Sequence, residues 1–94
     1  MDITRELRNL VSTGEVSFGF KEAVKAAKKK KAKLVILSKN CKKEQAEQIK
    51  AVEGIKTFDY EGSNFDLGAA CGKPFAISML TVVTAGDSKI LDLI

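Results

Sequence analysis

The chain has 94 residues, a mass of 10.2 kDa and a formal net charge of +4, from 16 Lys and Arg against 12 Asp and Glu. This length predicts one domain, residues 1–94, and 45% hydrophobic with 30% charged residues is typical of a globular protein rather than a disordered one. The chain has no histidine, which excludes Ser-His-Asp and Cys-His catalysis and histidine-based metal sites. We therefore expect no enzyme, no metal and no other cofactor.

The cysteines and the N-terminus bear on the compartment. Cys41 and Cys71 are too few for a secreted disulfide scaffold and lack CxxC spacing, so we expect free thiols, buried or half-buried, in a reducing cytosol. Residues 1–6 carry no apolar segment behind a basic stretch, and no window approaches the roughly 20 apolar residues that span a bilayer. These features predict a soluble cytoplasmic protein without a signal peptide.

The first third of the chain predicts helix, strand, helix. Residues 2–12 have apolar residues at helical spacing behind Asp2, an expected N-cap, and residues 13–14 end that helix. Residues 16–18 alternate as a short strand, which Gly19 ends, and a second helix follows from about residue 20. The expected inward positions of these two helices are Ile3, Leu7, Leu10, Val11, Val24 and Ala27.

The middle of the chain predicts a buried strand, a helix and a second strand. Residues 34–37 form a continuous apolar segment, typical of a strand covered on both faces. After a turn at 38–41, residues 42–53 predict a helix, and residues 57–60 predict a strand. The expected inward positions of this helix are Ala46, Ile49 and Val52, and Gly54 closes it.

The last third contains two expected capping boxes. Residues 63–66 fit a capping box that opens a short helix ending near residues 71–72. Residues 75–83 predict the longest apolar strand, and residues 84–87 resemble a second capping box before a final helix that carries Ile90 and Leu91. The alternation of helices and strands predicts an α/β protein, a three-layer α/β/α sandwich around a four-stranded mixed sheet.

The net charge is unevenly distributed along the chain. Residues 21–50 contain eleven of the fourteen lysines and three glutamates, a net charge of +8, whereas the other residues sum to −4. Lysine runs are usually solvated surface, but such asymmetry within one small domain favours a polyanionic partner.

Four loops carry the candidate site. Strand-to-helix loops gather at one edge of such a sheet, where helix N-termini present free N–H groups to anions. Three of these loops, residues 19–21, 38–43 and 61–64, pair a small residue with a donor-rich side chain, and a helix-to-strand loop at 72–75 adds a cation, a proline and an aromatic ring. If this fourth loop lies beside the other three, the set would supply phosphate contacts, amide groups for base edges and a stacking ring, which recognition of irregular RNA needs.

Each candidate residue also has a plain structural role open to it. Gly19 could be a turn glycine, Phe75 a core residue of the last strand, and Asn64 a surface residue after an N-cap. Asn40 could be the N-cap of the helix that follows it. We expect these loops and residues 21–50, which we call the basic third of the chain, to lie at the same edge of the sheet, and this favours RNA as the ligand.

Several segments together resemble the ribosomal large-subunit protein thirty-e family. This family belongs to the kink-turn-binding superfamily shared with ribosomal protein seven-A-e and occurs in archaea and eukaryotes. The resemblance covers nearly the whole chain, and its last segment is typical of the thirty-e branch. The segments that carry it are Val16–Lys21, Ala32–Asn40, Glu61–Gly68, Gly72–Phe75 and Ala85–Leu91.

The resemblance implies a sandwich that grips ribosomal RNA at a kink-turn-like internal loop. Gly19 and Lys21 would meet the backbone of the bent strand, Asn40 would hydrogen-bond a guanine edge, and Phe75 would pack on an extruded base or sugar. Some relatives follow the aromatic residue with a basic one, where this chain has Ala76. The expected RNA-binding residues are Gly19, Phe20, Lys21, Asn40, Lys42, Lys43, Asn64, Gly72, Lys73 and Phe75.

The expected function is that of a structural, archaeal-type protein of the large ribosomal subunit in the cytoplasm, monomeric when free. Its partners would be ribosomal RNA and neighbouring ribosomal proteins, with no membrane. One alternative is a kink-turn adaptor of a guide-RNA or RNase P particle. Others are a protein-interaction module and a small nucleotide-binding α/β domain. The chain has neither a GxGxxG nor a GxxxxGK[ST] motif, which argues against nucleotide binding.

Overall fold

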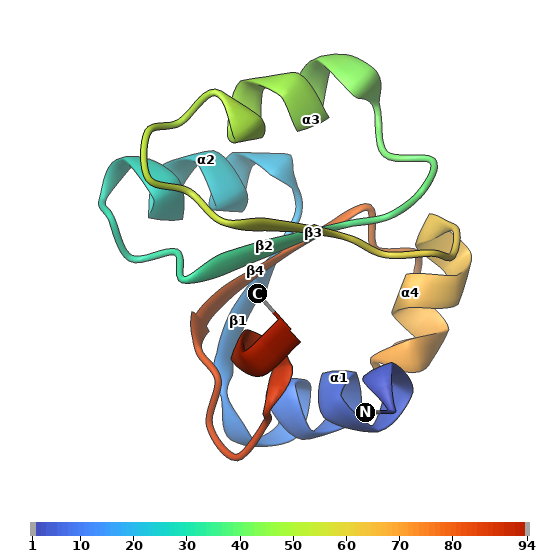
Figure 1. Ribbon diagram of the computed structural model, residues 1–94. Coiled ribbons are helices and arrows are strands. Elements are labelled where there is room, and N and C mark those ends of the chain that lie inside the picture. The colour runs from blue at the N-terminus through green and yellow to red at the C-terminus, as the bar shows by residue number, and fades with distance from the viewer. Residues whose placement is uncertain (1, 94) are drawn as a thin grey trace.

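The computed structural model describes residues 2–93, in which helices and strands alternate along the chain (Figure 1). This order is the one that the sequence predicts, except that the last helix is a short 3₁₀ helix. The elements are α1 (Ile3–Thr13), β1 (Glu15–Phe18), α2 (Phe20–Lys28), β2 (Leu34–Leu37), α3 (Lys43–Lys50), β3 (Thr57–Asp59), α4 (Asn64–Ala70), β4 (Met79–Thr84) and η1 (Ile90–Leu93).

The four strands form one mixed sheet in the order β1-β4-β2-β3. The strand β4 is antiparallel to β1 and β2, and β2 is parallel to β3. Figure 1 shows α2 and α3 on one face of the sheet and α1, α4 and η1 on the other. The predicted three-layer α/β/α sandwich is therefore confirmed.

Strand β2 supplies side chains to both cores, as its continuous apolar sequence predicts. Leu34 and Ile36 pack against the core beneath α1 and α4, whereas Val35 and Leu37 belong to the core beneath α2 and α3. All four are buried. Because successive strand residues point to opposite faces, a strand covered on both sides must be apolar at every position.

Local capping signals were good predictors of where helices begin. The carboxylate of Asp2 accepts from the backbone N–H groups of Thr4 and Arg5 and caps α1. Ser63 and Asp66 form the complete capping box at the start of α4, each side chain accepting from the other residue's backbone N–H. Such caps satisfy N–H donors that the first helical turn leaves free.

The predicted strand over residues 75–83 is wrong at its start, because β4 begins at Met79. Residues 75–78 form a loop that lies against α4: the backbone N–H of Ile77 donates to the carbonyl of Asn64 at 2.9 Å. Since that donor is bonded to α4, it cannot bond a neighbouring strand. The alternative role considered for Phe75, a core residue of the last strand, is therefore wrong, because its side chain is 49% exposed.

The helix predicted over residues 42–53 is shorter in the structure. It ends at Lys50, and the N–H groups of Val52 and Ile55 bond three residues back in tight turns, to Ile49 and Val52 respectively. The expected inward positions Ala46 and Ile49 do pack on the core beneath α2 and α3.

The second capping box, predicted at residues 84–87, does not form. Instead, the Thr84 hydroxyl accepts from the N–H of Glu15 at 3.0 Å. The carboxylate of Glu6 in α1 accepts from the N–H of Lys89 at 2.7 Å and so binds the last segment to the first helix. No helix in the described part of the chain has the length and apolar content needed to cross a membrane.

Candidate nucleic-acid interface

Four loops meet at one edge of the sheet: the three strand-to-helix loops, as predicted, and the helix-to-strand loop beside them. Strands β1, β2 and β3 all end there and β4 starts there, since β1 and β2 are both antiparallel to β4. We call this surface the loop edge, and it comprises residues 19–21, 38–43, 61–65 and 72–78. Its loops are bonded to each other through Gly19 N–H to Met79 O, Ser38 N–H to Ser78 O, Lys39 N–H to Gly62 O, and Ile77 N–H to Asn64 O, at 2.8–2.9 Å.

Two asparagines form the polar centre of the loop edge. The Asn40 amide group donates through Nδ2 to Oδ1 of Asn64 at 2.9 Å, and its Oδ1 accepts from the backbone N–H of Asn64 at 2.8 Å. The same Oδ1 of Asn40 accepts from the Ser38 hydroxyl at 3.1 Å. Because a backbone N–H is always a donor, the atom of Asn40 that faces it must be the oxygen, which sets the orientation of the amide.

The oxygens of the pair are saturated and the amide hydrogens are not. Oδ1 of Asn64 also accepts from the N–H of Phe65 at 3.0 Å, so each amide oxygen already accepts two hydrogen bonds. Within residues 2–93, Nδ2 of Asn64 and the second hydrogen of Asn40 Nδ2 have no hydrogen-bond partner. The pair therefore presents three donors and no free acceptor to an approaching ligand.

The alternative role considered for Asn40, N-cap of the helix that follows it, is wrong. The N-cap of α3 is Lys42, which makes no side-chain capping bond. Asn40 serves α4 instead, 24 residues further along the chain, by accepting from the N–H of its first residue. This N–H is one of the donors that a helix start leaves unsatisfied.

The aromatic ring of Phe75 is held at the loop edge by an edge-to-face contact. Its centroid lies 5.8 Å from that of Phe18, the last residue of β1, with 79° between the ring planes. The ammonium group of Lys73 lies 5.9 Å from the Phe18 centroid. Both geometries are favourable for aromatic quadrupoles, so Phe18 positions the ring and the cation of the 72–78 loop.

Phe65 is a loop-edge aromatic residue that is not among the RNA-binding residues expected from the sequence. It lies in the first turn of α4, next to Asn64, and is 74% exposed. A signal was present in the sequence: Phe65 is two residues from Leu67, which is buried, and two residues correspond to about 200° around a helix. The two side chains must therefore lie on opposite faces.

Gly19 and Gly72 open the backbone of the loop edge to close approach. Their φ angles are +97° and +75°, a region that other residues rarely adopt, and no atom lies within 4 Å of where a Cβ would be. The predicted turn role of Gly19 and its predicted close approach to a ligand are thus both compatible with its geometry.

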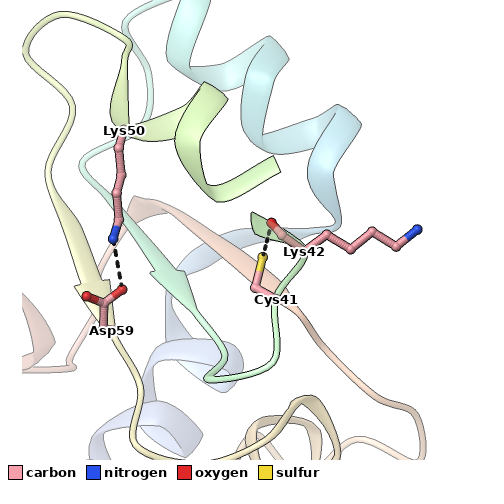
Figure 2. Close-up of polar contacts among 4 residues, drawn as sticks. All are labelled: Cys41, Lys42, Lys50 and Asp59. Carbon is pink, nitrogen blue, oxygen red and sulfur yellow. Dashed lines mark hydrogen bonds and ion pairs between the residues drawn. The ribbon is translucent and has the colours of Figure 1, made fainter. Parts of the chain in front are cut away.

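The remaining expected residues lie at the starts of α2 and α3. Phe20 is half-buried and packs on the core beneath these helices. Lys21, Lys42 and Lys43 are exposed. Figure 2 shows the Lys42 side chain extending away from α3 while its carbonyl accepts a weak bond from the Cys41 thiol at 3.8 Å.

The basic third of the chain does not lie wholly at the loop edge, contrary to expectation. Lys21, Lys39, Lys42 and Lys43 are there, but α2 runs away from this edge and carries residues 28–33 to the opposite end of the sheet (Figure 1). Lys50 at the end of α3 forms an ion pair with Asp59 at 3.4 Å (Figure 2).

Both cysteines are free, as predicted; Cys41 is half-buried and Cys71 is buried. Burial raises the pKa of the Cys41 thiol despite nearby Lys50. Burial also raises the pKa of the Cys71 thiol to about 11, against the opposing charge of Lys73. A thiol with a raised pKa favours the folded state below its ordinary pKa of 9.0. That contribution is lost as the pH rises through about 11.

We expect Cys71 to resist alkylation in the native protein. Thiolate is the reactive form, so a pKa of about 11 against an ordinary 9.0 lowers the rate at pH 8 about 100-fold. The measurement is iodoacetamide labelling of the Cys41→Ser variant at pH 8, native and in denaturant. Equal rates in the two conditions would contradict the burial of this thiol.

Residues 2–93 contain no group of three or more Cys, Asp or Glu side chains placed to hold a metal ion. The donors that the loop edge presents are amide hydrogens, backbone N–H groups and ammonium groups. These groups bind anions and hydrogen-bond acceptors, so the arrangement is suited to recognition of a ligand rich in phosphate and base acceptors.

Comparison with known proteins agrees with this chemistry. Residues 1–92 match the model of the ribosomal protein L7Ae/L30e/S12e/Gadd45 family. The chain is 43% identical over 93 residues to large ribosomal subunit protein eL30 of Methanospirillum hungatei, covering 99% of this chain and 98% of the relative. It is 42% identical over 92 residues to eL30 of Saccharolobus solfataricus, covering 95% and 85%.

A third relative, eL30 of Methanothermobacter thermautotrophicus, is 37% identical over 97 aligned positions that cover 100% of this chain and 99% of the relative. The aligned region thus extends over the whole chain. The chain belongs to the L7Ae/L30e/S12e/Gadd45 family of ribosomal proteins.

Proposed function

We propose that this protein is a structural, non-enzymatic component of the large ribosomal subunit in the cytoplasm and binds a kink-turn-like internal loop of ribosomal RNA at the loop edge. Its ribosomal assignment is supported by relatives that carry the name large ribosomal subunit protein eL30. Neighbouring ribosomal proteins would be its other partners, and the free protein would be a monomer.

The observation that carries the proposal is the donor-only surface of the Asn40–Asn64 pair. A ligand that pairs with it must present acceptors side by side. Guanine does so through O6 and N7, whereas adenine places a donor beside its N7 acceptor. The saturated oxygens of both asparagines would reject that adenine donor. We therefore assign the pair to a guanine edge.

The aromatic residues of the loop edge fit bases that have left the helix. Phe75 and Phe65 are 49% and 74% exposed, and unstacked bases bind such rings in RNA complexes. Phe18 contacts both the ring of Phe75 and the ammonium group of Lys73 and so stabilises their positions. A duplex keeps its bases stacked, so these rings favour an irregular internal loop.

The RNA backbone would be bound by the glycines and lysines around this centre. Gly19 and Gly72 leave room for close approach, and Lys21, Lys42 and Lys43 would contact phosphates. Residue 76, which follows Phe75, is an exposed alanine and supplies no charge. Lys73, on the same loop, would supply the charge there.

The test is the affinity for a kink-turn RNA compared with the same RNA closed into a regular duplex, at 0.15 M salt. We expect the kink-turn to bind at least about 100-fold more tightly, since specific protein–nucleic acid binding exceeds non-specific binding by more than this. Equal affinities would overturn the proposal. Tighter binding to guide-RNA or RNase P kink-turns than to ribosomal ones would instead favour the adaptor function.

A further inference from the structure

A second group of lysines lies at the end of the sheet opposite the loop edge. We call it the far-edge cluster, and all its members are exposed. Lys33 and Lys56 immediately precede β2 and β3, whose other ends form the loop edge; Lys33 N–H donates to Val82 O at 2.7 Å, and Lys56 O accepts from Val35 N–H at 3.0 Å. The cluster comprises Lys28, Lys29, Lys30, Lys31, Lys33 and Lys56.

Three lysines of the far-edge cluster, Lys30, Lys33 and Lys56, lie along adjoining depressions of the surface. Lys33 and Lys56 line a shallow depression with Gly54, and Gly54 also lines the next depression, with Lys30. Figure 1 shows the loops after α2 and α3 side by side at this end of the molecule. Chain segments that are separate in the sequence thus contribute to one basic surface.

The charges of the cluster are not neutralised within the protein. Glu53 lines the depression that contains Lys30, and Glu15 and Glu22 line a third depression together with Lys29 and Lys31. None of these carboxylates comes within 4.0 Å of a lysine nitrogen, because the one ion pair among the described residues is that of Lys50 with Asp59. Six ammonium groups therefore remain available to an external anion.

One lysine of the cluster occupies a backbone position where glycine is favoured. Lys30 has a φ of +57°. Its N–H donates to Ala27 O at 3.1 Å, and the N–H of Lys31 donates to Ala26 O at 2.9 Å. These bonds form the Schellman motif that ends many helices, in which this residue is usually glycine. The protein thus carries a charged side chain where a glycine would fit the backbone with less strain.

The composition of the surface favours a nucleic-acid backbone over a protein partner. Protein interfaces have an apolar centre and few lysines. The large hydrophobic residues that are exposed in the described chain, Phe65 and Phe75, both lie at the loop edge and not here. Contacts to phosphates need only positive charge and carry no sequence information.

We propose that the far-edge cluster is a second, sequence-independent contact for an RNA backbone, and that the protein joins two RNA segments at opposite ends of its sheet. The joining of two segments rests on the function proposed above for the loop edge; the second contact itself does not. The two surfaces are separated by the length of α2, whose nine residues span about 13 Å. RNA at one surface therefore leaves the other accessible.

The test uses a variant in which Lys28, Lys29, Lys31 and Lys33 are all replaced by Gln. Glutamine has nearly the helix propensity of lysine, and Lys30 is retained to keep its backbone unchanged. The matched control replaces the same four lysines with Arg. A second variant, Lys33→Gln with Lys56→Gln, tests the cluster without changing α2.

In the first measurement, the free full-length protein binds a regular RNA duplex of about 16 base pairs over a range of salt concentrations. We expect the four-Gln variant to bind at least about 10-fold more weakly at low salt, with the slope of log K against log salt reduced by about 3 to 4, and the Arg control to match wild type. An unchanged slope would overturn the second contact.

In the second measurement, protein bound to an immobilised kink-turn RNA captures the same duplex in labelled form. Wild type should capture it, and the four-Gln variant should occupy the immobilised RNA yet lose most of the capture. Equal capture by both proteins would overturn the proposal. Polyglutamate and unlabelled duplex are then compared as competitors at equal concentrations of negative charge. If polyglutamate displaces the labelled duplex at the lower concentration, the cluster favours an acidic protein partner and the proposal is overturned. If the protein shows no preference for kink-turn RNA over duplex, the function proposed for the loop edge is refuted. The second contact is not, because the first measurement uses a duplex and does not depend on kink-turn binding.

Discussion

Replacing Gly68 with alanine is expected to destabilise the protein by about 2 kcal/mol and to weaken kink-turn binding at least 10-fold, the stability loss being typical of overpacking. Gly68 is a buried residue of α4. A Cβ there would collide with the carbonyl oxygen of Phe75 and lie 3.0 Å from its carbonyl carbon. The 72–78 loop would have to move, and the ring of Phe75 would move with it.

Helix propensity alone would make the Gly68→Ala variant more stable by about 1 kcal/mol. The expected loss of stability has the opposite sign. The measurement is urea unfolding together with kink-turn affinity. The matched control is Ala69→Gly, at the exposed neighbouring position, which should cost about 1 kcal/mol through propensity and leave RNA binding unchanged. A Gly68→Ala variant more stable than wild type would show that the loop does not rest on α4.

Replacing Asn40 with aspartate is expected to reduce kink-turn affinity about 100-fold or more, while the free energy of unfolding changes by less than about 1 kcal/mol; a single base contact is worth about 1–3 kcal/mol. The aspartate oxygens would still accept from the Asn64 N–H and the Ser38 hydroxyl. The donor of residue 40 and its bond to Oδ1 of Asn64 would be lost, and a negative charge would face the RNA.

The Asn40→Ala variant separates recognition from loop positioning. It removes the donor and also leaves the first N–H of α4 without its acceptor, so it should cost about 1 kcal/mol of stability in addition to affinity. Asn9→Asp is the charge-matched control, because Asn9 lies in α1 and outside every loop of the loop edge. Equal losses of affinity in Asn9→Asp and Asn40→Asp would show that net charge alone is responsible.

The architecture was predictable because its signals are local. Residues 34–37 are apolar at every position, and only a strand between two helix layers buries such a segment on both faces. The Asp2 cap and the capping box of Ser63 and Asp66 act within four residues of chain. Periodicity and capping depend on the backbone of one element, so they can be read in the sequence.

The candidate site was predictable only in part. The meeting of the four loops follows from strand direction, because the ends of parallel strands share one edge of a sheet. The partner of Asn40 did not follow from it, since Asn40 and Asn64 are 24 residues apart. Because Asn40 lies next to the start of α3, its position in the sequence predicts a cap for that helix. In the structure, α4 packs against the 38–43 loop, and Asn40 therefore bonds the N–H group of Asn64 instead.

The exposure of Phe75 and the separation of the lysines have the same kind of cause. Phe75 follows Pro74 and precedes apolar residues, a pattern typical of a strand, but Gly68 lets its backbone lie on α4, and β4 begins later. Residues 21–50 are a single basic segment in the sequence, yet α2 carries some of its lysines to the end of the sheet opposite the loop edge.

Composition, periodicity and caps therefore determined the fold class, the order of the elements and the sign of the charge on the binding partner, because each depends on residues close together in the chain. Tertiary packing determined which donors remain free at the Asn40–Asn64 pair and where Phe75 lies. It also divided the lysines of residues 21–50, a segment of net charge +8, between two surfaces. These features depend on contacts between segments distant in the sequence, whose geometry is set by how the helices pack on the sheet.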